Sequence, residues 1–174
     1  MTTFVALLRG INVGGRRKVA MADLRTVFAE AGAENVSSYI QSGNVVFTHR
    51  TRSPDKLGGD LEKRIETVTG LAVPVYLRTG QEWEAVIAAN PFPAAEPTTL
   101  HVAFLNGEPD PAAADTIDRE AFAPEEFAVV GRQVYLHLPN GMARTKLPQA
   151  LEALGPPTIR NWRTVTKLAE LAAG

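Results

Sequence analysis

The residues best suited to chemistry begin in a glycine-rich stretch at positions 6–15, which reads ALLRGINVGG. Gly10 and Gly15 have the separation of the two glycines in the phosphate-binding loop G-x-x-x-x-G-K-[ST]. Arg16 and Arg17, however, replace the lysine and the hydroxyl residue that would hold magnesium. The sequence therefore excludes that loop. It leaves two interpretations open: a turn between a strand and a helix, or a looser anion site made of backbone N–H groups and positive charge.

Two further stretches place amides, hydroxyls and cations close together. Residues 39–44 read YIQSGN, and residues 158–168 read TIRNWRTVTKL. The first fits a hairpin tip or a set of groups that hydrogen-bond a ligand. The second fits an amphipathic C-terminal helix, with Asn161 at its start and Trp162 on its apolar face, or a basic ligand-binding face. Nearby, residues 142–147 read MARTKL and add two more cations.

Together the stretches ALLRGINVGG, YIQSGNVVF and RNWRTVTKL resemble a mostly bacterial family of unknown function, numbered 1697, over residues 4–171. The resemblance implies an architecture of tandem ferredoxin-like halves and supplies no activity. Many relatives carry serine before the lysine in MARTKL, and Thr145 keeps a hydroxyl there. From these motifs we take as candidate ligand-binding residues Arg9, Gly10, Asn12, Gly14, Gly15, Lys18, Tyr39, Gln41, Ser42, Asn44, Arg144, Thr145, Lys146, Arg160, Asn161, Trp162 and Lys167.

Charge is distributed unevenly along a chain whose net charge is only −1. Residues 1–52 hold seven Lys or Arg against three Asp or Glu, and residues 140–174 hold five against two. The middle, residues 53–139, holds six against fourteen. The pattern fits an uneven solvated surface, or two basic ends that meet in one cationic groove.

Side chains for metal or acid–base chemistry are sparse among these motifs. The chain has no cysteine, and His49, His101 and His137 are far apart in sequence, without metal-ligand spacing. The one carboxylate close to the motifs, Asp23, lies on a predicted helix away from its apolar face. We therefore expect no metal site and no cofactor, and a site that holds phosphate or carboxylate groups rather than one that transfers protons.

The elements that must position the motifs follow the order βαββαβ in the first half. Strands are predicted at 3–9, 36–41, 44–49 and 72–78, with helices from Met21 to Ala31 and from Pro54 onwards. The second helix should bury Leu57, Leu61, Ile65 and Val68, with Ser53 as its cap. Pro74 cannot donate a ladder hydrogen bond, so the last strand should lie at a sheet edge. This order is that of a ferredoxin-like α+β unit.

The second half partly repeats this order. A connecting helix at 81–90 leads to strands at 98–105, 126–131 and 133–138 and to helices at 110–120 and 144–154. In the last of these strands, Val134, Leu136 and Leu138 should face one way and Gln133, Tyr135 and His137 the other. The half is expected to end in a C-terminal helix where the fourth strand would fall. We predict two tandem ferredoxin-like halves with antiparallel sheets, residues 1–90 and 91–174, divided near the Pro/Ala-rich segment 91–97.

The function that these observations favour is the binding of a phosphate-bearing anion, such as a nucleotide or RNA, in a basic groove. Two alternatives stay open: an enzyme acting on a phosphorylated substrate, and a protein–protein interaction module whose acidic middle pairs with a basic partner. No segment has the roughly 20 apolar residues that span a bilayer, so we expect a cytoplasmic protein without a membrane partner. The sequence leaves the oligomeric state undecided.

Overall fold

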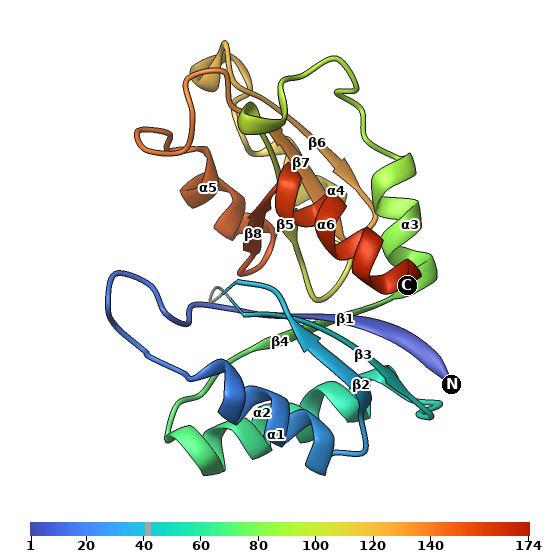
Figure 1. Cartoon of the computed structure of the whole chain (residues 1–174). Helices are drawn as coiled ribbons and strands as arrows, with labels where there is room; N and C mark the ends of the chain where they lie inside the picture. The colour runs from blue at the N-terminus through green and yellow to red at the C-terminus, as the bar shows by residue number, and fades with distance from the viewer. Residues whose placement is uncertain (41–42) are drawn as a thin grey trace. The chain divides into compact units, whose positions relative to one another are not determined.

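The computed structural model describes residues 1–40 and 43–174, and the chain divides into two compact units (Figure 1). The first unit contains residues 1–84 and 168–174, and the second contains residues 85–167. Each holds a four-stranded antiparallel sheet with helices packed on it. This confirms the predicted α+β fold of two ferredoxin-like halves.

The first unit has the βαββαβ order that the sequence predicts. Its elements are β1 (Thr2–Leu8), α1 (Met21–Glu30), β2 (Glu34–Ser38), β3 (Asn44–His49), α2 (Pro54–Thr69) and β4 (Val75–Thr79). The strand order is β2-β3-β1-β4, so the strand that follows Pro74 lies at an edge, as predicted.

Helices α1 and α2 cover one face of this sheet (Figure 1). Phe4, Ala6 and Leu8, alternate residues of β1, are buried there together with Phe28 of α1 and Leu61 of α2. The N–H of Leu8 donates to the carbonyl of Gly43 at 2.8 Å. The start of the glycine-rich loop is therefore fixed by the sheet.

Two details of α2 differ from the sequence prediction. Ser53 occupies the N-cap position, but its side chain makes no capping hydrogen bond. Val68 is 54% exposed, whereas Leu57, Leu61 and Ile65 are buried. Helical spacing places Val68 on the same side of the helix as Leu57, but spacing alone does not show where the packed surface beneath a helix ends.

The second unit repeats the architecture. Its elements are η1 (Pro97–Thr99), β5 (Leu100–Phe104), α4 (Pro111–Asp115), η2 (Glu120–Phe122), β6 (Glu126–Val130), β7 (Gln133–His137), α5 (Leu147–Ala150), η3 (Leu151–Leu154) and β8 (Thr158–Asn161). The strand order is β6-β7-β5-β8. Helix α3 (Gly80–Ala88) and helix α6 (Trp162–Ala173) each include residues of both units.

The second half contains a fourth strand that the sequence analysis missed. Strand β8 pairs antiparallel with β5, and α6 follows it directly. The segment gave no strand signal because it is four residues long, carries one apolar residue, Ile159, and follows two prolines. The helix expected at 144–154 is a four-residue α-helix continued by a 3-10 turn, and the one expected at 110–120 is the five-residue α4.

Strand β7 shows the predicted alternation of faces. Val134 and Leu136 enter the core of the second unit, together with Leu138 just beyond the strand. Tyr135 points to the other face, is fully buried, and donates its phenol hydrogen to the carbonyl of Val86 at 2.6 Å. Val86 lies in the last turn of α3, where carbonyls lack helical partners. The phenol of Tyr135 therefore supplies a hydrogen-bond donor to a carbonyl at the C-terminal end of α3.

Replacing this phenol tests its contribution. Tyr135→Phe should lower the free energy of unfolding by about 1–3 kcal/mol at neutral pH, because a buried carbonyl loses its donor. Burial raises the pKa of Tyr135 to about 12 from its ordinary value of 10. The unfolded chain therefore loses this proton first, and wild-type stability should fall between pH 10 and 12. Urea unfolding of Tyr135→Phe should show a smaller fall over that range, and equal falls would contradict the assignment.

Candidate functional site

The glycine-rich loop after β1 is a self-bonded turn. The N–H of Asn12 donates to the carbonyl of Arg17 at 3.0 Å, and Val13 and Arg16 form an isolated antiparallel bridge. Gly10, Gly14 and Gly15 all have positive φ, and a Cβ at any of them would meet nothing within 4 Å. Their backbone conformation therefore explains these glycines without a close ligand.

Arg17 anchors the loop. Its Nε donates to the carbonyl of Gly10 at 2.8 Å and its Nη2 donates to the carbonyl of Ala72 at 2.6 Å. Its φ of 51° lies in the left-handed region, which costs a non-glycine residue about 1–2 kcal/mol. These hydrogen bonds offset that cost, so Arg17 has a structural role here.

The remaining candidates of this loop differ in exposure. The side chain of Asn12 bonds within the loop, since its amide donates to the carbonyl of Val19 and its oxygen accepts from the N–H of Val19. Arg9 is half-buried, and its N–H donates to the carbonyl of Pro74. Lys18 is exposed, as are Gly10, Gly14 and Gly15. Their assignment as ligand-binding residues stays a prediction.

The second motif lies against the first. A Cβ on Gly43 would come within 2.8 Å of the Leu8 Cβ and 3.0 Å of the Ile11 Cδ1. Asn44 is fully buried, and its side-chain amide donates a hydrogen bond to the backbone carbonyl of Tyr39. The residue Tyr39 is half-buried. The structure thus brings motifs one and two together and gives Asn44 a hairpin-closing role. Gln41 and Ser42 lie outside the described residues.

The third motif forms strand β8 and the beginning of α6. Arg160 is buried, and its Nη1 donates to the Thr158 hydroxyl at 2.8 Å and to the carbonyl of Ile159 at 3.0 Å. Burial lowers the pKa of Arg160 to about 10, which still leaves it charged near neutral pH. The Asn161 oxygen accepts from the N–H of Thr164, which confirms Asn161 as the helix cap.

The other candidates on α6 are Trp162, which is half-buried, and Lys167, which is exposed. Arg9 and Lys18 belong to the first unit, whereas Arg160 and Lys167 belong to the second. The single groove predicted to join the two basic ends of the chain therefore stays a prediction.

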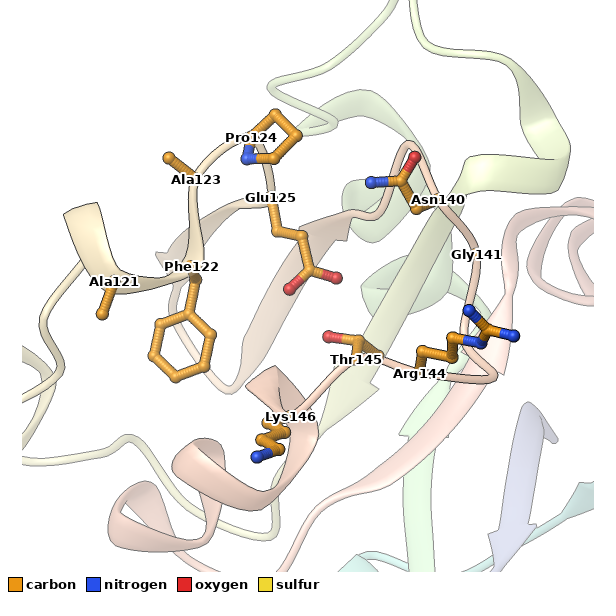
Figure 2. Close-up of a pocket in the computed structure, with 10 residues that line it drawn as sticks. All are labelled: Ala121, Phe122, Ala123, Pro124, Glu125, Asn140, Gly141, Arg144, Thr145 and Lys146. Atoms are coloured by element: carbon orange, nitrogen blue, oxygen red, sulfur yellow. The ribbon is translucent and has the colours of Figure 1, made fainter.

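Three residues of MARTKL, Arg144, Thr145 and Lys146, line a cavity of about 480 Å³ within the second unit (Figure 2). We call it the basic cavity. The described residues that line it are Ala121, Phe122, Ala123, Pro124, Glu125, Asn140, Gly141, Arg144, Thr145 and Lys146. None of the described residues 160–167 is among them.

Two turns build the walls of the basic cavity. One follows β7, where the N–H of Gly141 donates to the carbonyl of Leu138, and its sequence Leu-Pro-Asn-Gly places proline and glycine where such a turn favours them. The other closes when the N–H of Glu125 donates to the carbonyl of Phe122 at 2.8 Å, and its Ala123–Pro124 bond is cis. The second turn places an aromatic ring and a carboxylate on the same wall.

The polar groups of the basic cavity carry both signs of charge. In Figure 2 the Glu125 carboxylate and the Thr145 hydroxyl face each other, and Arg144 and Lys146 extend on either side of Thr145. The Thr145 oxygen accepts from the N–H of Leu147 at 3.1 Å, and a hydroxyl can still donate its own hydrogen. Within residues 1–40 and 43–174, the side chains of Glu125, Arg144 and Lys146 make no ion pair or hydrogen bond.

Sequence reasoning found the cationic wall of this cavity but missed Phe122 and Glu125. The two residues belong to the acidic middle region, in a segment where no motif pointed to chemistry. Phe122 and Glu125 lie beside the MARTKL residues only because the turn at 122–125 folds next to them. This contact joins segments that are distant in sequence, so no local pattern of residues could have predicted it.

Another cavity of the second unit has the opposite character. It has a volume of about 550 Å³ and is lined by residues of 91–99 together with Glu126, His137 and Pro139. The carboxylates of Glu96 and Glu126 line it, and no Lys or Arg is among its described lining residues. Anions would be repelled there, so the two cavities differ in the ligands that they favour.

Neither a metal-binding cluster nor a membrane-spanning helix is found among the described residues. No group of three or more His, Cys, Asp or Glu side chains is arranged in that part of the chain to hold a metal ion. None of its helices has both the length and the hydrophobicity that crossing a bilayer requires.

The comparisons with known proteins assign the family and the fold. A model of the family "Protein of unknown function (DUF1697)" matches residues 1–135, and the chain therefore belongs to this family. The solved structure of the conserved bacterial protein SP0830 from Streptococcus pneumoniae is similar, with a TM-score of 0.77 and 24% sequence identity. The similarity covers 100% of this chain and 99% of that one. No curated protein matches the sequence.

The contact between motifs one and two can be tested at Gly43. Gly43→Ala should lower the free energy of unfolding by about 2–4 kcal/mol, since φ is +83° and the new Cβ meets Leu8 and Ile11. Gly59→Ala is the matched control: it lies inside α2 with nothing within 4 Å, and it should be neutral or slightly stabilising. Urea unfolding of both variants makes the measurement, and equal effects would refute the contact.

Proposed function

We propose that this protein binds a phosphate-bearing small molecule of nucleotide size in the basic cavity. The observation that carries the proposal is the placement of Arg144 and Lys146 on either side of the Thr145 hydroxyl at the wall of one cavity (Figure 2). Arginine and lysine form charge-assisted hydrogen bonds to phosphate oxygens, and a hydroxyl adds a directed one. Within the described residues, the side chains of Arg144 and Lys146 make no ion pair or hydrogen bond that would have to break before a ligand binds.

The size and build of the cavity support a small molecule. Its volume of about 480 Å³ lies within the range of roughly 300–1,000 Å³ that is typical of ligand pockets. The half-buried ring of Phe122 gives it an apolar surface beside the charges. A phosphate with an aromatic or sugar body attached fits this combination better than a bare inorganic ion does.

A second candidate function is the turnover of a phosphorylated substrate. The observation that favours it is the Glu125 carboxylate, which faces the Thr145 hydroxyl in Figure 2 and could accept a proton from a bound water or hydroxyl. Release of phosphate from a panel of phosphoesters, abolished in Glu125→Gln, would favour this function over binding alone.

The acidic lining of the other cavity favours a third candidate, docking of a basic partner protein, which a pull-down that recovers one partner would support.

The binding proposal predicts the effect of removing the two cations. Arg144→Ala and Lys146→Ala should each weaken binding of pyrophosphate and of a mixture of nucleoside monophosphates by about tenfold or more, because each loses a hydrogen bond between charged groups. Isothermal titration calorimetry at about 50 mM salt measures this, since phosphate contacts are strongest at low ionic strength. Affinity should fall as salt is added.

Arg163→Ala supplies the control for this measurement. Arg163 is an exposed arginine of the same unit that does not line the basic cavity, so its loss matches Arg144→Ala in charge. Unchanged affinity in Arg163→Ala together with weakened affinity in the two cavity variants supports the proposal. Absence of binding by the wild type at low salt, or equal losses in all three variants, overturns it.

A further inference from the structure

The basic cavity holds charges of both signs that do not pair with each other. The carboxylate of Glu125 and the cations of Arg144 and Lys146 line the same space of about 480 Å³. Within residues 1–40 and 43–174, none of these three side chains makes an ion pair or a hydrogen bond. A ligand that enters between them therefore meets one negative and two positive groups, each able to interact with it.

The carboxylate lies where it would oppose a simple anion. In Figure 2 it faces the hydroxyl of Thr145, which follows Arg144 and precedes Lys146 in the chain. Glu125 is half-buried, so its charge is less screened by water than that of a fully exposed residue. A phosphate held at the cations comes near this negative charge and is repelled by it. A positive group on the same ligand turns the repulsion into attraction.

Both walls are fixed by backbone hydrogen bonds before a ligand arrives. The N–H of Glu125 donates to the carbonyl of Phe122 at 2.8 Å, which closes the turn on one side. On the other side the Thr145 oxygen accepts from the N–H of Leu147 at 3.1 Å. Walls that are already ordered cost less conformational entropy when a ligand bridges them.

We propose that the basic cavity binds phosphate esters that also carry a protonated amine, with the phosphate at Arg144 and Lys146 and the ammonium group at Glu125; this inference rests on the proposed function. An ammonium group has three N–H donors and a carboxylate only accepts, so the two form hydrogen bonds between charged groups. A phosphate without an amine leaves the Glu125 carboxylate unpaired beside its own negative charge. It therefore binds more weakly.

The experiment compares phosphates that differ only in the amine. The aminoalkyl probes are 2-aminoethyl, 3-aminopropyl and 4-aminobutyl phosphate, and their matched partners are propyl, butyl and pentyl phosphate, in which a methyl group replaces the ammonium. Calorimetry at about 50 mM salt gives the affinities for the wild type and for Glu125→Gln. At least one aminoalkyl phosphate should bind the wild type about tenfold or more tightly than its partner, as expected for a hydrogen bond between charged groups.

Glu125→Gln should abolish or reverse this preference. The amine loses its ionic partner, so the aminoalkyl phosphates bind more weakly, whereas the alkyl phosphates lose a repulsion and bind more tightly. Tighter binding of the alkyl phosphates also shows that the variant keeps the cavity folded. Weaker binding of every probe in Glu125→Gln would assign the residue a structural role and overturn the inference.

Glu120→Gln is the matched control. Glu120 is an exposed carboxylate of the same unit that does not line the basic cavity, so its substitution removes an equal charge from outside the site. The ratio of each aminoalkyl phosphate to its partner should stay within about twofold of the wild type, since exposed charges are screened by water and salt. A fall as large as that in Glu125→Gln would show a general effect of net charge and contradict direct contact.

Failure of the inference differs from failure of the phosphate site. If pyrophosphate and the alkyl phosphates bind the wild type but no amine improves the affinity, the inference is overturned and the phosphate site stands. If no phosphate binds at low salt, the proposed function fails as well.

Discussion

The structure depends on two central strands, β1 and β5, that are almost entirely buried. Val5, Leu7 and Leu8 of β1 have no exposed surface, and Val102 and Phe104 of β5 have none either. A polar side chain in such a strand is costly unless it is hydrogen-bonded. Strand β5 carries one such group, His101, whose Nδ1 has no hydrogen-bond partner among the described residues. The other groups that could bind a ligand lie at strand ends and in the neighbouring loops. The glycine-rich loop, Tyr39 and Asn44, and the two walls of the basic cavity all lie in such places.

The edge strands β4 and β8 each carry a buried arginine that is hydrogen-bonded. Arg78 of β4 pairs with Val5 of β1, and Arg160 of β8 pairs with Val102 of β5, so each half places an arginine opposite the centre of its buried strand. Both arginines are buried and donate to the carbonyl of the preceding residue. The correspondence indicates a repeated structural element in the two halves, which share element order far more than sequence. A buried arginine of this kind must keep its hydrogen bonds, because an unpaired buried charge is strongly destabilising.

Much of the fold could be predicted from sequence because its signals are local. Pro74 predicted an edge strand, alternation in residues 133–138 predicted the two faces of β7, and the helical spacing of Leu57, Leu61 and Ile65 predicted a buried face. Strand β8 could not be predicted, since four mostly polar residues after two prolines become a strand only through pairing with β5. The same distinction holds for the site. The cations of MARTKL stood out by type and spacing, whereas Glu125 joins them through a tertiary contact that no local pattern records.

We propose that phosphate binds at the cavity wall that includes Asn140, Gly141, Arg144, Thr145 and Lys146. The most direct measurement is an NMR titration of the ¹⁵N-labelled protein with pyrophosphate at low salt, followed through its backbone amides. We expect saturable shifts that are largest at Gly141, Thr145 and Lys146, with smaller shifts at Phe122 and Glu125 across the cavity. Saturable shifts confined to other parts of the chain, or no saturable shifts at all, would contradict it.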